Sequence, residues 1–422
     1  MVGDRLQLAV HELHSSGVGA GQHPTYGRIY VPFTFPGDQV EIELTDQPRT
    51  GQWNARRIVS PKGDCYLAGE CGGCLWPATP YEDQLRWKEL LFRRAVAVLP
   101  QLAAINQKIH GNGGNLEFRS RVHLHANFYR GKLNFGFFAR GERRLVAIAD
   151  CPVAEAPIRR VIAELSAAKD TRWPQADFGF GIELTHLAEE SCVLLVLYAA
   201  PQRRAALEAA LPAFAALPSR PRVHLAYTED NPTFLWQRLR GVTMYTRPGC
   251  FQQINRAQSN CVRGLIAGRL QQFQGGVFFD LYSGSGNYSL PLYSLAGSIF
   301  GCDDNPLGIA VAQYNVEQNA LTNGHYVRAD AGQVMALPER YGWPKRADFI
   351  VCDPARFGLA KELPHLIAQA RPQELVLVSN NTVAFVKDAR GLLRAGFNPV
   401  KIDLVDFFPN TPHWNVVSVW RL

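Results

Sequence analysis

The stretch Val277-Phe278-Phe279-Asp280-Leu281-Tyr282-Ser283-Gly284-Ser285-Gly286-Asn287 decides the fold. Its apolar first half predicts a buried strand, and the glycines that follow predict a tight turn before a helix. Glycine has no Cβ atom, so the backbone of such a turn can approach a ligand at the carboxyl edge of a sheet. We therefore expect a ligand site lined by Asp280, Tyr282, Gly284 and Gly286.

Three further strands follow this one, and each leads to an acid. Ser298–Asp303 ends in Asp303, which is placed to accept hydrogen bonds from ribose hydroxyls. A third strand precedes Asp330, expected near an adenine ring, and a fourth, Phe349–Cys352, delivers Asp353 to the same edge. Each acid alone could be a helix cap or a turn residue. Together they predict an α/β domain with a Rossmann-like parallel sheet over residues 247–422, with helices on both faces.

The glycine turn also narrows the choice of cofactor. No lysine follows the second glycine, which argues against a phosphate-binding ATPase loop, and the third glycine of a dinucleotide site is missing. S-adenosylmethionine is the best fit, so the pattern favours a class I methyltransferase.

Composition sets broader limits. The chain has 422 residues, of which 47% are hydrophobic and 19% charged, so we expect two or three globular domains. Lys and Arg outnumber Asp and Glu by 44 to 37, a formal charge of +7, which suits a polyanion but also many plain cytosolic proteins. The chain begins without a signal-peptide pattern and has no stretch long enough to span a bilayer. We expect a monomeric cytoplasmic protein without a membrane partner.

Short alternating runs over residues 1–60 predict a small five-stranded, OB-like β-barrel, although a small sandwich without a ligand would leave the same trace. Residues 61–246 predict a central α+β domain. Helical spacing over Pro80–Leu99 places Leu85, Leu91, Phe92, Ala95, Val98 and Leu99 on one stripe, interrupted by Lys88. Strands over Arg119–Ala126 and Leu133–Phe138 interleave Arg, His and aromatic residues, which fits either an RNA-facing sheet or an ordinary two-sided sheet.

Four of the nine cysteines, Cys65, Cys71, Cys74 and Cys151, form a metal-binding pattern. Four thiolates can hold one zinc ion or ligate a cubane iron-sulfur cluster. The spacing of three near cysteines plus one distant one favours iron-sulfur, since structural zinc usually uses two near pairs. Buried free thiols are the alternative.

With these motifs in place, the chain resembles the uracil-C5 RNA methyltransferase family, in particular its iron-sulfur members that act on 23S ribosomal RNA. The resemblance covers nearly the whole chain. It rests on a TRAM-type barrel at the start, the four cysteines, Phe251-Gln252-Gln253-Ile254-Asn255, Asp280–Asn287, Asp353-Pro354-Ala355-Arg356 and Asp406-Phe407-Phe408-Pro409-Asn410-Thr411-Pro412-His413.

The resemblance implies a function and a set of contacts. Gln253, Tyr282, Gly284, Asp303 and Asp330 are implied to contact S-adenosylmethionine, with Asp353 facing the target base. A [4Fe-4S] cluster on the four cysteines and extrusion of the base from folded ribosomal RNA are also implied. Phe251 is a candidate stacking surface, with a plain core aromatic as the alternative, and Arg356 is a candidate RNA contact.

Two positions depart from the family pattern. In the family a cysteine adds to C6 of uracil and a carboxylate helps to remove the C5 proton. Here Asn380 stands at the first position and Asn415 at the second, and Thr382 replaces a usual proline. A carboxamide is neither a thiolate-class nucleophile nor a base near neutral pH. Ordinary C5 methylation is therefore not expected.

Three functions remain open. The first is an RNA methyltransferase with changed chemistry, in which Cys250 is the nucleophile or a heteroatom is the methyl acceptor; as an alternative, Cys250 is a small packed residue. The second is an inactive paralogue that binds folded RNA as an assembly factor or chaperone. The third, a small-molecule methyltransferase, is disfavoured by the N-terminal barrel.

Overall fold

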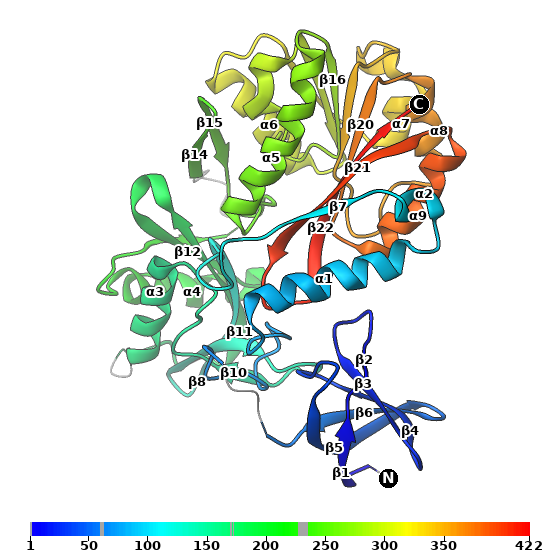
Figure 1. Ribbon diagram of the computed structural model, residues 1–422. Coiled ribbons are helices and arrows are strands. Elements are labelled where there is room, and N and C mark those ends of the chain that lie inside the picture. Colours follow the sequence, from blue (N-terminus) through cyan, green and yellow to red (C-terminus); the bar gives the residue numbers. More distant parts are fainter. Residues whose placement is uncertain (1, 60–62, 169–170, 172, 227–234) are drawn as a thin grey trace.

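The computed structural model describes residues 2–59, 63–168, 171, 173–226 and 235–422. Figure 1 shows a small N-terminal sheet (blue), a central sheet with its helices (cyan to green) and a larger C-terminal sheet (yellow to red). Within these residues, none of the helices combines the length and the hydropathy that crossing a membrane requires.

The N-terminal sheet has the strand order β1-β5-β6-β4-β3-β2. Its strands are β1 Arg5–Ala9, β2 Glu12–Leu13, β3 Gly19–His23, β4 Gly27–Val31, β5 Gln39–Arg49 and β6 Gln52–Arg57. In β5, Val40, Ile42 and Leu44 alternate with more exposed residues and point into an apolar core, around which β1 curls back to contact β3. The sequence predicted five strands. The described residues form six, because β2 and β3 contain too few apolar residues to show alternation.

Helix α1 connects this sheet to the rest of the molecule. The predicted helix is confirmed as α1 Tyr81–Val96, followed by α2 Pro100–Ala103 and the short strand β7 Gln107–His110. Val98 lies beyond α1 and is 59% exposed, so its assignment to the apolar stripe was wrong. Lys88, which interrupts that stripe, is fully buried.

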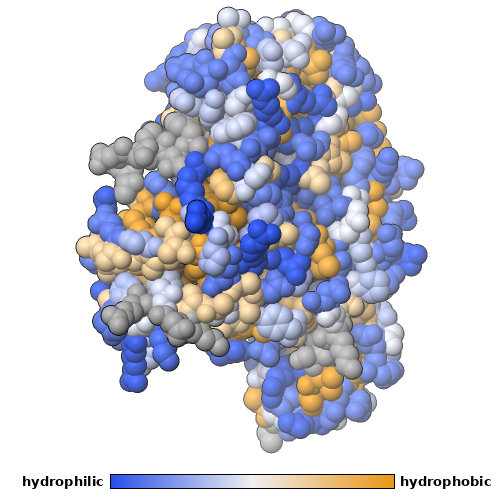
Figure 2. Space-filling model, turned by 90° about the vertical axis from the view of Figure 1, so that its left-hand side faces the viewer, coloured by the Kyte–Doolittle hydropathy of each residue, from blue (hydrophilic) through white to orange (hydrophobic). Residues whose placement is uncertain are grey.

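The central sheet has the order β10-β9-β8-β11-β12-β13 and is antiparallel except for the last pair. Its strands are β8 Arg121–Tyr129, β9 Lys132–Phe138, β10 Leu145–Ala147, β11 Phe178–Leu187, β12 Cys192–Tyr198 and β13 Arg222–Leu225. Helices α3 Ala156–Ala167 and α4 Arg204–Ala215 pack their apolar residues on one face of it. Figure 2, viewed from the side of these helices, shows apolar residues gathered at mid-height between more hydrophilic regions above and below. A hairpin, β14 Leu235–Leu239 and β15 Val242–Thr246, leads on to the C-terminal part.

The C-terminal sheet has the order β18-β17-β16-β19-β20-β22-β21-β7. Its strands are β16 Val277–Leu281, β17 Ser298–Asp303, β18 Gly324–Arg328, β19 Phe349–Cys352, β20 Glu374–Ser379, β21 Asn398–Phe408 and β22 His413–Arg421. Its helices are α5 Arg256–Leu270, α6 Pro306–Gln318, α7 Ala331–Ala336, α8 Leu363–Gln369 and α9 Thr382–Arg394. Short 3₁₀ helices cover Ala188–Glu190, Pro201–Arg203, Gln271–Phe273, Leu290–Leu295 and Pro338–Tyr341.

The predicted Rossmann-like arrangement is confirmed for β16 to β20, which are mutually parallel. One face of the sheet packs against α1, α7, α8 and α9, and the other against α5 and α6. The last strand departs from the parallel pattern, because β22 runs antiparallel to both β20 and β21. The division at residues 60 and 246 stays a prediction, and β7, from the predicted central segment, is the edge strand of the C-terminal sheet.

Candidate active site

The glycine turn follows β16, and several of its residues have a left-handed backbone conformation. Tyr282 has φ +65°, a left-handed conformation that a bulky side chain rarely adopts, and Gly284 and Gly286 have φ +52° and +79°. A Cβ atom on Gly308, at the start of α6, would lie 3.2 Å from the carbonyl carbon of Gly284. The helix therefore begins directly against the turn, and the chain is shaped here for a close approach of backbone groups.

Asp280 lies beneath the turn and is only 1% exposed. Its Oδ2 accepts a hydrogen bond from the hydroxyl of Ser289, which lies 2.6 Å from the hydroxyl of Tyr326. Burial, reinforced by the charges of Asp353 and Asp303, raises the pKa of Asp280 to about 7. Among the described residues, its Oδ1 and the hydroxyl of Ser283 are buried and have no hydrogen-bond partner. Two polar atoms next to the turn thus remain available to a ligand.

Asp303 ends β17 and holds the neighbouring backbone. Its Oδ2 accepts from the N–H of Gly284 and its Oδ1 from the N–H of Asn305, both at 2.9 Å. Each carboxylate oxygen keeps a further lone pair that can accept another donor. Asp330 instead caps α7, where its Oδ1 accepts from the N–H of Gln333 at 3.1 Å. This capping hydrogen bond leaves other lone pairs of the Asp330 carboxylate available to a ligand.

Asp353 follows β19 and is partly buried. Its carboxylate hydrogen-bonds the side chain of Tyr288, and Gln253 reaches the same hydroxyl at 3.4 Å. Burial raises the pKa of Asp353 to about 7. A carboxyl group in this state can accept or release a proton near neutral pH. The structure therefore brings together Gln253 and Asp353, two residues that the sequence placed at the site separately.

Asn380 and Asn415 lie at the same edge of two neighbouring strands. Ser379, the last residue of β20, pairs with Val416 of β22; Asn380 directly follows Ser379, and Asn415 directly precedes Val416. The Oδ1 atoms of both amides are buried, and neither has a partner among the residues that the structure describes. The following residue, Asn381, is the cap of α9 and accepts from the N–H groups of Val383 and Ala384. The two amides are thus not needed to finish the helix, and they offer unsatisfied acceptors at the carboxyl edge.

Exposed apolar side chains lie along this edge of the sheet. Phe251 is 71% exposed, which excludes the alternative of a core aromatic. Phe357 and Val383, which follow β19 and β20, are 89% and 81% exposed. Arg356 is also exposed, and its charge helps to lower the pKa of His413, although burial is the larger cause.

The four predicted metal ligands lie in one patch of the central region. Cys65, Cys71, Cys74 and Cys151 are all free and partly exposed. Burial raises the pKa of Cys74 to about 12 and that of Cys151 to about 11, and the neighbouring thiols add to both shifts. The N–H of Gly73 points at the sulfur of Cys71 at 3.4 Å. Within the described ranges, however, no three His, Cys, Asp or Glu side chains are arranged closely enough to hold a metal ion.

The chain is similar in sequence to known proteins. Residues 238–420 match the family described as tRNA (uracil-5-)-methyltransferase. The 23S rRNA (uracil(1939)-C(5))-methyltransferase RlmD of Shewanella amazonensis is 26% identical, covering 99% of this chain and 96% of that protein. The 23S rRNA (uracil(747)-C(5))-methyltransferase of Pyrococcus horikoshii is 27% identical, covering 97% of each chain. Over nearly its whole length, the chain is therefore similar to uracil-C5 RNA methyltransferases.

The fold agrees with this similarity. The crystal structure of Pyrococcus abyssi tRNA (uracil-54, C5)-methyltransferase superposes with a TM-score of 0.73 and 21% identity, covering 98% of this chain and 99% of that one. The likeness therefore extends over the whole architecture, from the N-terminal sheet to the methyltransferase sheet.

In this chain, Cys250 is not placed as a substitute nucleophile. It is 4% exposed, and its thiol is directed to the carbonyl of Leu307 at 3.9 Å. Burial raises the pKa of Cys250, which disfavours the thiolate. This geometry favours the alternative of a small packed residue.

Sequence reasoning missed Arg263 of α5. Its guanidinium is almost fully buried and donates to Asn287 and Ser259 at 2.8 Å and to Asn260 at 2.6 Å. Burial lowers the pKa of Arg263 to about 10. The residue ties the end of the glycine turn to α5. An arginine on the buried face of an amphipathic helix was the only signal that could have found it.

Proposed function

We propose that this protein binds S-adenosylmethionine at the carboxyl edge of its C-terminal sheet and holds a nucleotide of RNA against Asn380 and Asn415. The observation that carries the proposal is the set of buried, unpartnered oxygen atoms at this edge. Those of Asp280 and Ser283 lie at the glycine turn, and those of Asn380 and Asn415 lie two and three strands away. Buried acceptors without partners are costly unless a ligand supplies donors.

The residues of the turn suit S-adenosylmethionine. Asp303 would accept hydrogen bonds from the two ribose hydroxyls, while Asp330 and Tyr282 would lie against the adenine. Gln253 and Asp353 would lie at the end that faces the RNA base. When bound, the cofactor supplies an electrophilic methyl group. The Pyrococcus abyssi relative was crystallised with S-adenosyl-L-homocysteine, which supports this assignment.

The partner is proposed to be RNA, and ribosomal RNA in particular. The relatives named above act on 23S rRNA or on tRNA. The formal charge of +7 suits a polyanion, and the exposed Phe251 could stack on a base.

Methyl transfer by the covalent route is not available to this chain. Neither amide can add to C6 of uracil, and without that addition C5 stays a poor nucleophile. Asp353, with a pKa of about 7, can still take up a proton from an acceptor. We infer that any methyl acceptor is a ring or exocyclic heteroatom, which needs deprotonation but no covalent activation.

A second candidate is an inactive paralogue that holds folded RNA during assembly. The pair Asn380 and Asn415 favours it, because two carboxamides can read a base edge as donors and acceptors but provide no catalytic group. Labelled S-adenosylmethionine, incubated with protein and total RNA from cells lacking the gene, separates the two. Label in RNA supports the enzyme, whereas salt-sensitive RNA binding without label supports the paralogue. Binding no tighter to RNA than to an arbitrary polyanion would end both.

Replacing Asp303 with alanine should weaken S-adenosylmethionine binding at least tenfold, because a hydrogen bond to a charged group contributes about 1.5–3 kcal/mol. Isothermal titration calorimetry measures the effect. Asp304→Ala is the matched control, since Asp304 is adjacent and exposed. Equal losses in both variants would show that Asp303 does not contact the cofactor.

We also propose a [4Fe-4S] cluster on Cys65, Cys71, Cys74 and Cys151. The spacing of four cysteines, their shared patch and the N–H of Gly73 directed at a sulfur support it. Holding the cluster would require the four sulfurs to move to ligand distance. The cluster would brace the central region.

Protein purified anaerobically should be brown, with broad visible absorbance and about four irons per chain. Cys74→Ser should lose most of the iron and lower the unfolding temperature, because the affinity of a bound metal adds to folding stability. Cys192→Ser is the control, since Cys192 lies elsewhere in the central sheet. Stoichiometric zinc in place of iron would overturn the assignment.

A further inference from the structure

The open face of the central sheet has an unusual composition. In β8, Val122, Leu124, Ala126 and Phe128 point into the core beneath α3 and α4. The alternate residues on the other face are Arg121, His123, His125, Asn127 and Tyr129. This row extends for about 27 Å at the rise of an extended strand. Among the residues that the structure describes, helices cover one face of β8, and the opposite face carries polar and aromatic side chains.

Four aromatic rings form a cluster on this face. His125 stacks on Phe138 of β9, with ring centroids 3.8 Å apart and planes inclined by 17°. His123 lies 6.0 Å from His125 and 5.8 Å from Tyr198 of β12. Glycine makes room for them: a Cβ atom on Gly181 would approach the His123 ring to 2.9 Å. Gly181 thus leaves the space on this face that the His123 ring occupies.

The row begins at the candidate active site. Arg121 donates to the carbonyl oxygens of Cys250 and Gln252 at 3.4 and 3.2 Å, within the loop that carries Phe251. Further along β12, Leu194 and Val196 on the same face pack with Leu235 of the hairpin. The rings therefore lie on the part of the sheet that continues directly from the active-site loop.

The open face carries both positive and negative side chains, and together they favour the binding of an anion. Arg121 lies 3.8 Å from Glu183, and burial raises the pKa of that carboxyl. Lys132 is exposed beside Tyr129, and Arg130 lies over the Tyr129 ring at 5.1 Å. Burial and the nearby His125 and Arg121 lower the pKa of His123, so its ring is uncharged at neutral pH. An uncharged imidazole is a suitable surface for a base.

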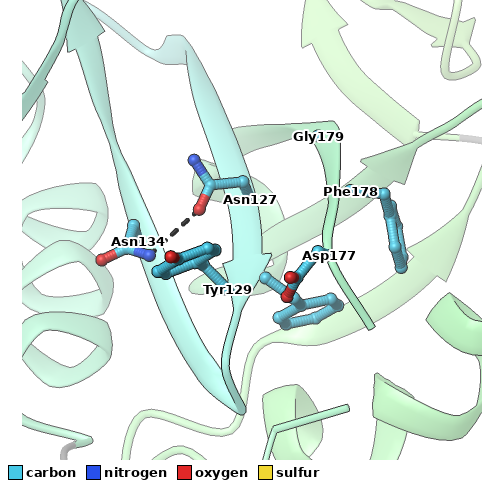
Figure 3. A pocket seen from close by; sticks show the side chains of 7 residues that line it. Asn127, Tyr129, Asn134, Asp177, Phe178 and Gly179 are labelled. Carbon is cyan, nitrogen blue, oxygen red and sulfur yellow. Dashed lines mark hydrogen bonds between the residues drawn. The ribbon is translucent and has the colours of Figure 1, made fainter. Parts of the chain in front are cut away.

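The far end of the row opens into a hollow of about 400 Å³. Figure 3 shows it between β8, β9 and the start of β11, with Asn127, Asn134, Tyr129 and Asp177 around it. The Nδ2 of Asn134 donates to the Oδ1 of Asn127 at 3.0 Å. This leaves the Nδ2 donors of Asn127 and the Oδ1 acceptor of Asn134 without a partner among the described residues. A donor next to an acceptor can match the hydrogen-bonding edge of a nucleobase.

We infer that this open face binds a single-stranded segment of the same RNA, next to the nucleotide held at the active site, with bases stacked on His123, His125 and Phe138 and one base in the hollow at Asn127. The inference rests on the proposed function. It is carried by the flat rings, by the paired amides of the hollow and by continuity with the active-site loop. A protein partner would instead favour an apolar surface, and this row has polar residues at both ends.

The test uses the full-length protein and a fluorescent single-stranded 12-mer of uridine, followed by anisotropy at fixed salt. A 12-mer of abasic ribose phosphates isolates the contribution of the bases. We expect the wild type to bind the uridine 12-mer at least tenfold tighter than the abasic one, because stacking contributes strongly for each base. The His123→Ala/His125→Ala variant should bind both alike. His365→Ala, an exposed histidine on α8, should behave as the wild type.

A second variant fills the hollow without removing any contact. Gly179 has an ordinary backbone conformation, and the nearest atom to an added Cβ is 3.7 Å away. Gly179→Phe should therefore fold, as circular dichroism can verify, and lose at least tenfold in affinity for the uridine 12-mer.

The outcomes separate the inference from the proposed function. If the wild type prefers the uridine 12-mer and neither the histidine pair nor Gly179→Phe changes that preference, the open face is not an RNA surface, although the protein still binds RNA. If the wild type does not distinguish uridine from abasic 12-mer while it binds S-adenosylmethionine, this inference is overturned and the RNA part of the proposed function must be tested with folded RNA. Failure to bind any RNA overturns both.

Discussion

Replacing Lys88 with alanine is expected to lower the free energy of unfolding by about 3–5 kcal/mol, because it leaves a buried carboxylate without its cation. Lys88 and Asp406 are both fully buried, with 2.5 Å between Nζ and Oδ1. Lys88 also donates to the carbonyl of Phe408 at 3.0 Å, and Tyr81 donates to Asp406 at 2.9 Å. The network joins α1 to β21, so its loss should affect the anchoring of the N-terminal half on the methyltransferase sheet.

Urea unfolding followed by tryptophan fluorescence measures the effect, since Trp76 lies 5.9 Å from the Lys88 ammonium and reports locally. Arg86→Ala is the matched control on the same helix: its ion pair with Asp83 is exposed and should contribute less than about 1 kcal/mol. The double replacement Lys88→Met/Asp406→Leu should recover much of the loss, because an apolar pair needs no compensation for buried charge. A loss below about 1 kcal/mol in Lys88→Ala would show that the pair is not desolvated in solution.

Lys88 also shows where sequence reasoning stops. The helical period of α1 was readable, and the lysine stood out as an interruption of the apolar stripe. Lys88 can be buried because it pairs with Asp406, a carboxylate 318 residues away, and no local pattern can indicate that partner. Likewise β7, Gln107-Lys108-Ile109-His110, contains a single apolar residue and is a strand only because it pairs with β21.

The parallel strands were predictable because their sequence signal is local. A strand covered by helices on both faces is a continuous apolar run, as in Leu375–Val378 of β20, and its end is marked by the first polar residue. That rule found Asp303 and Asp353 at the site. It could not find Arg263, because the residue acts from a helix, nor the placement of Asn415 beside the end of β20, because β22 runs against the parallel pattern.

Restoring the family's two reactive groups is expected to have the largest effect on activity. The variant Asn380→Cys/Asn415→Glu should form 5-methyluridine in RNA, whereas the wild type should form none. In the chemistry that the family resemblance implies, the thiolate sulfur bonds to C6, C5 takes the methyl group, the carboxylate removes the C5 proton, and the sulfur then leaves. General-base catalysis alone contributes about 10²–10⁴-fold, and the nucleophile adds to it, so we expect a rate at least about 10³-fold above the background measured with the wild type.

The single variant Asn380→Cys should form the covalent adduct but should not complete the reaction. With RNA containing 5-fluorouridine and S-adenosylmethionine, its thiolate should add to C6 and remain attached, because the fluorine at C5 cannot leave as a proton does. A protein–RNA band on a denaturing gel detects this adduct. Val383→Cys places an exposed thiol three residues away and serves as the control for non-specific attachment.

This prediction depends on geometry that the structure supplies. Position 380 directly follows the last residue of β20, and position 415 directly precedes that residue's partner on β22, so we expect a thiol and a carboxylate placed there to reach one base. Cys has a smaller side chain than Asn380, and Glu is longer than Asn415 by one methylene. Each amide has a buried oxygen without a partner among the described residues, so neither replacement breaks a hydrogen bond of that oxygen. An adduct trapped by the wild type, or 5-methyluridine made by it, would show that another group of this chain activates the base. If the double variant binds S-adenosylmethionine and RNA as the wild type does but makes no product, the base is not held against these two positions.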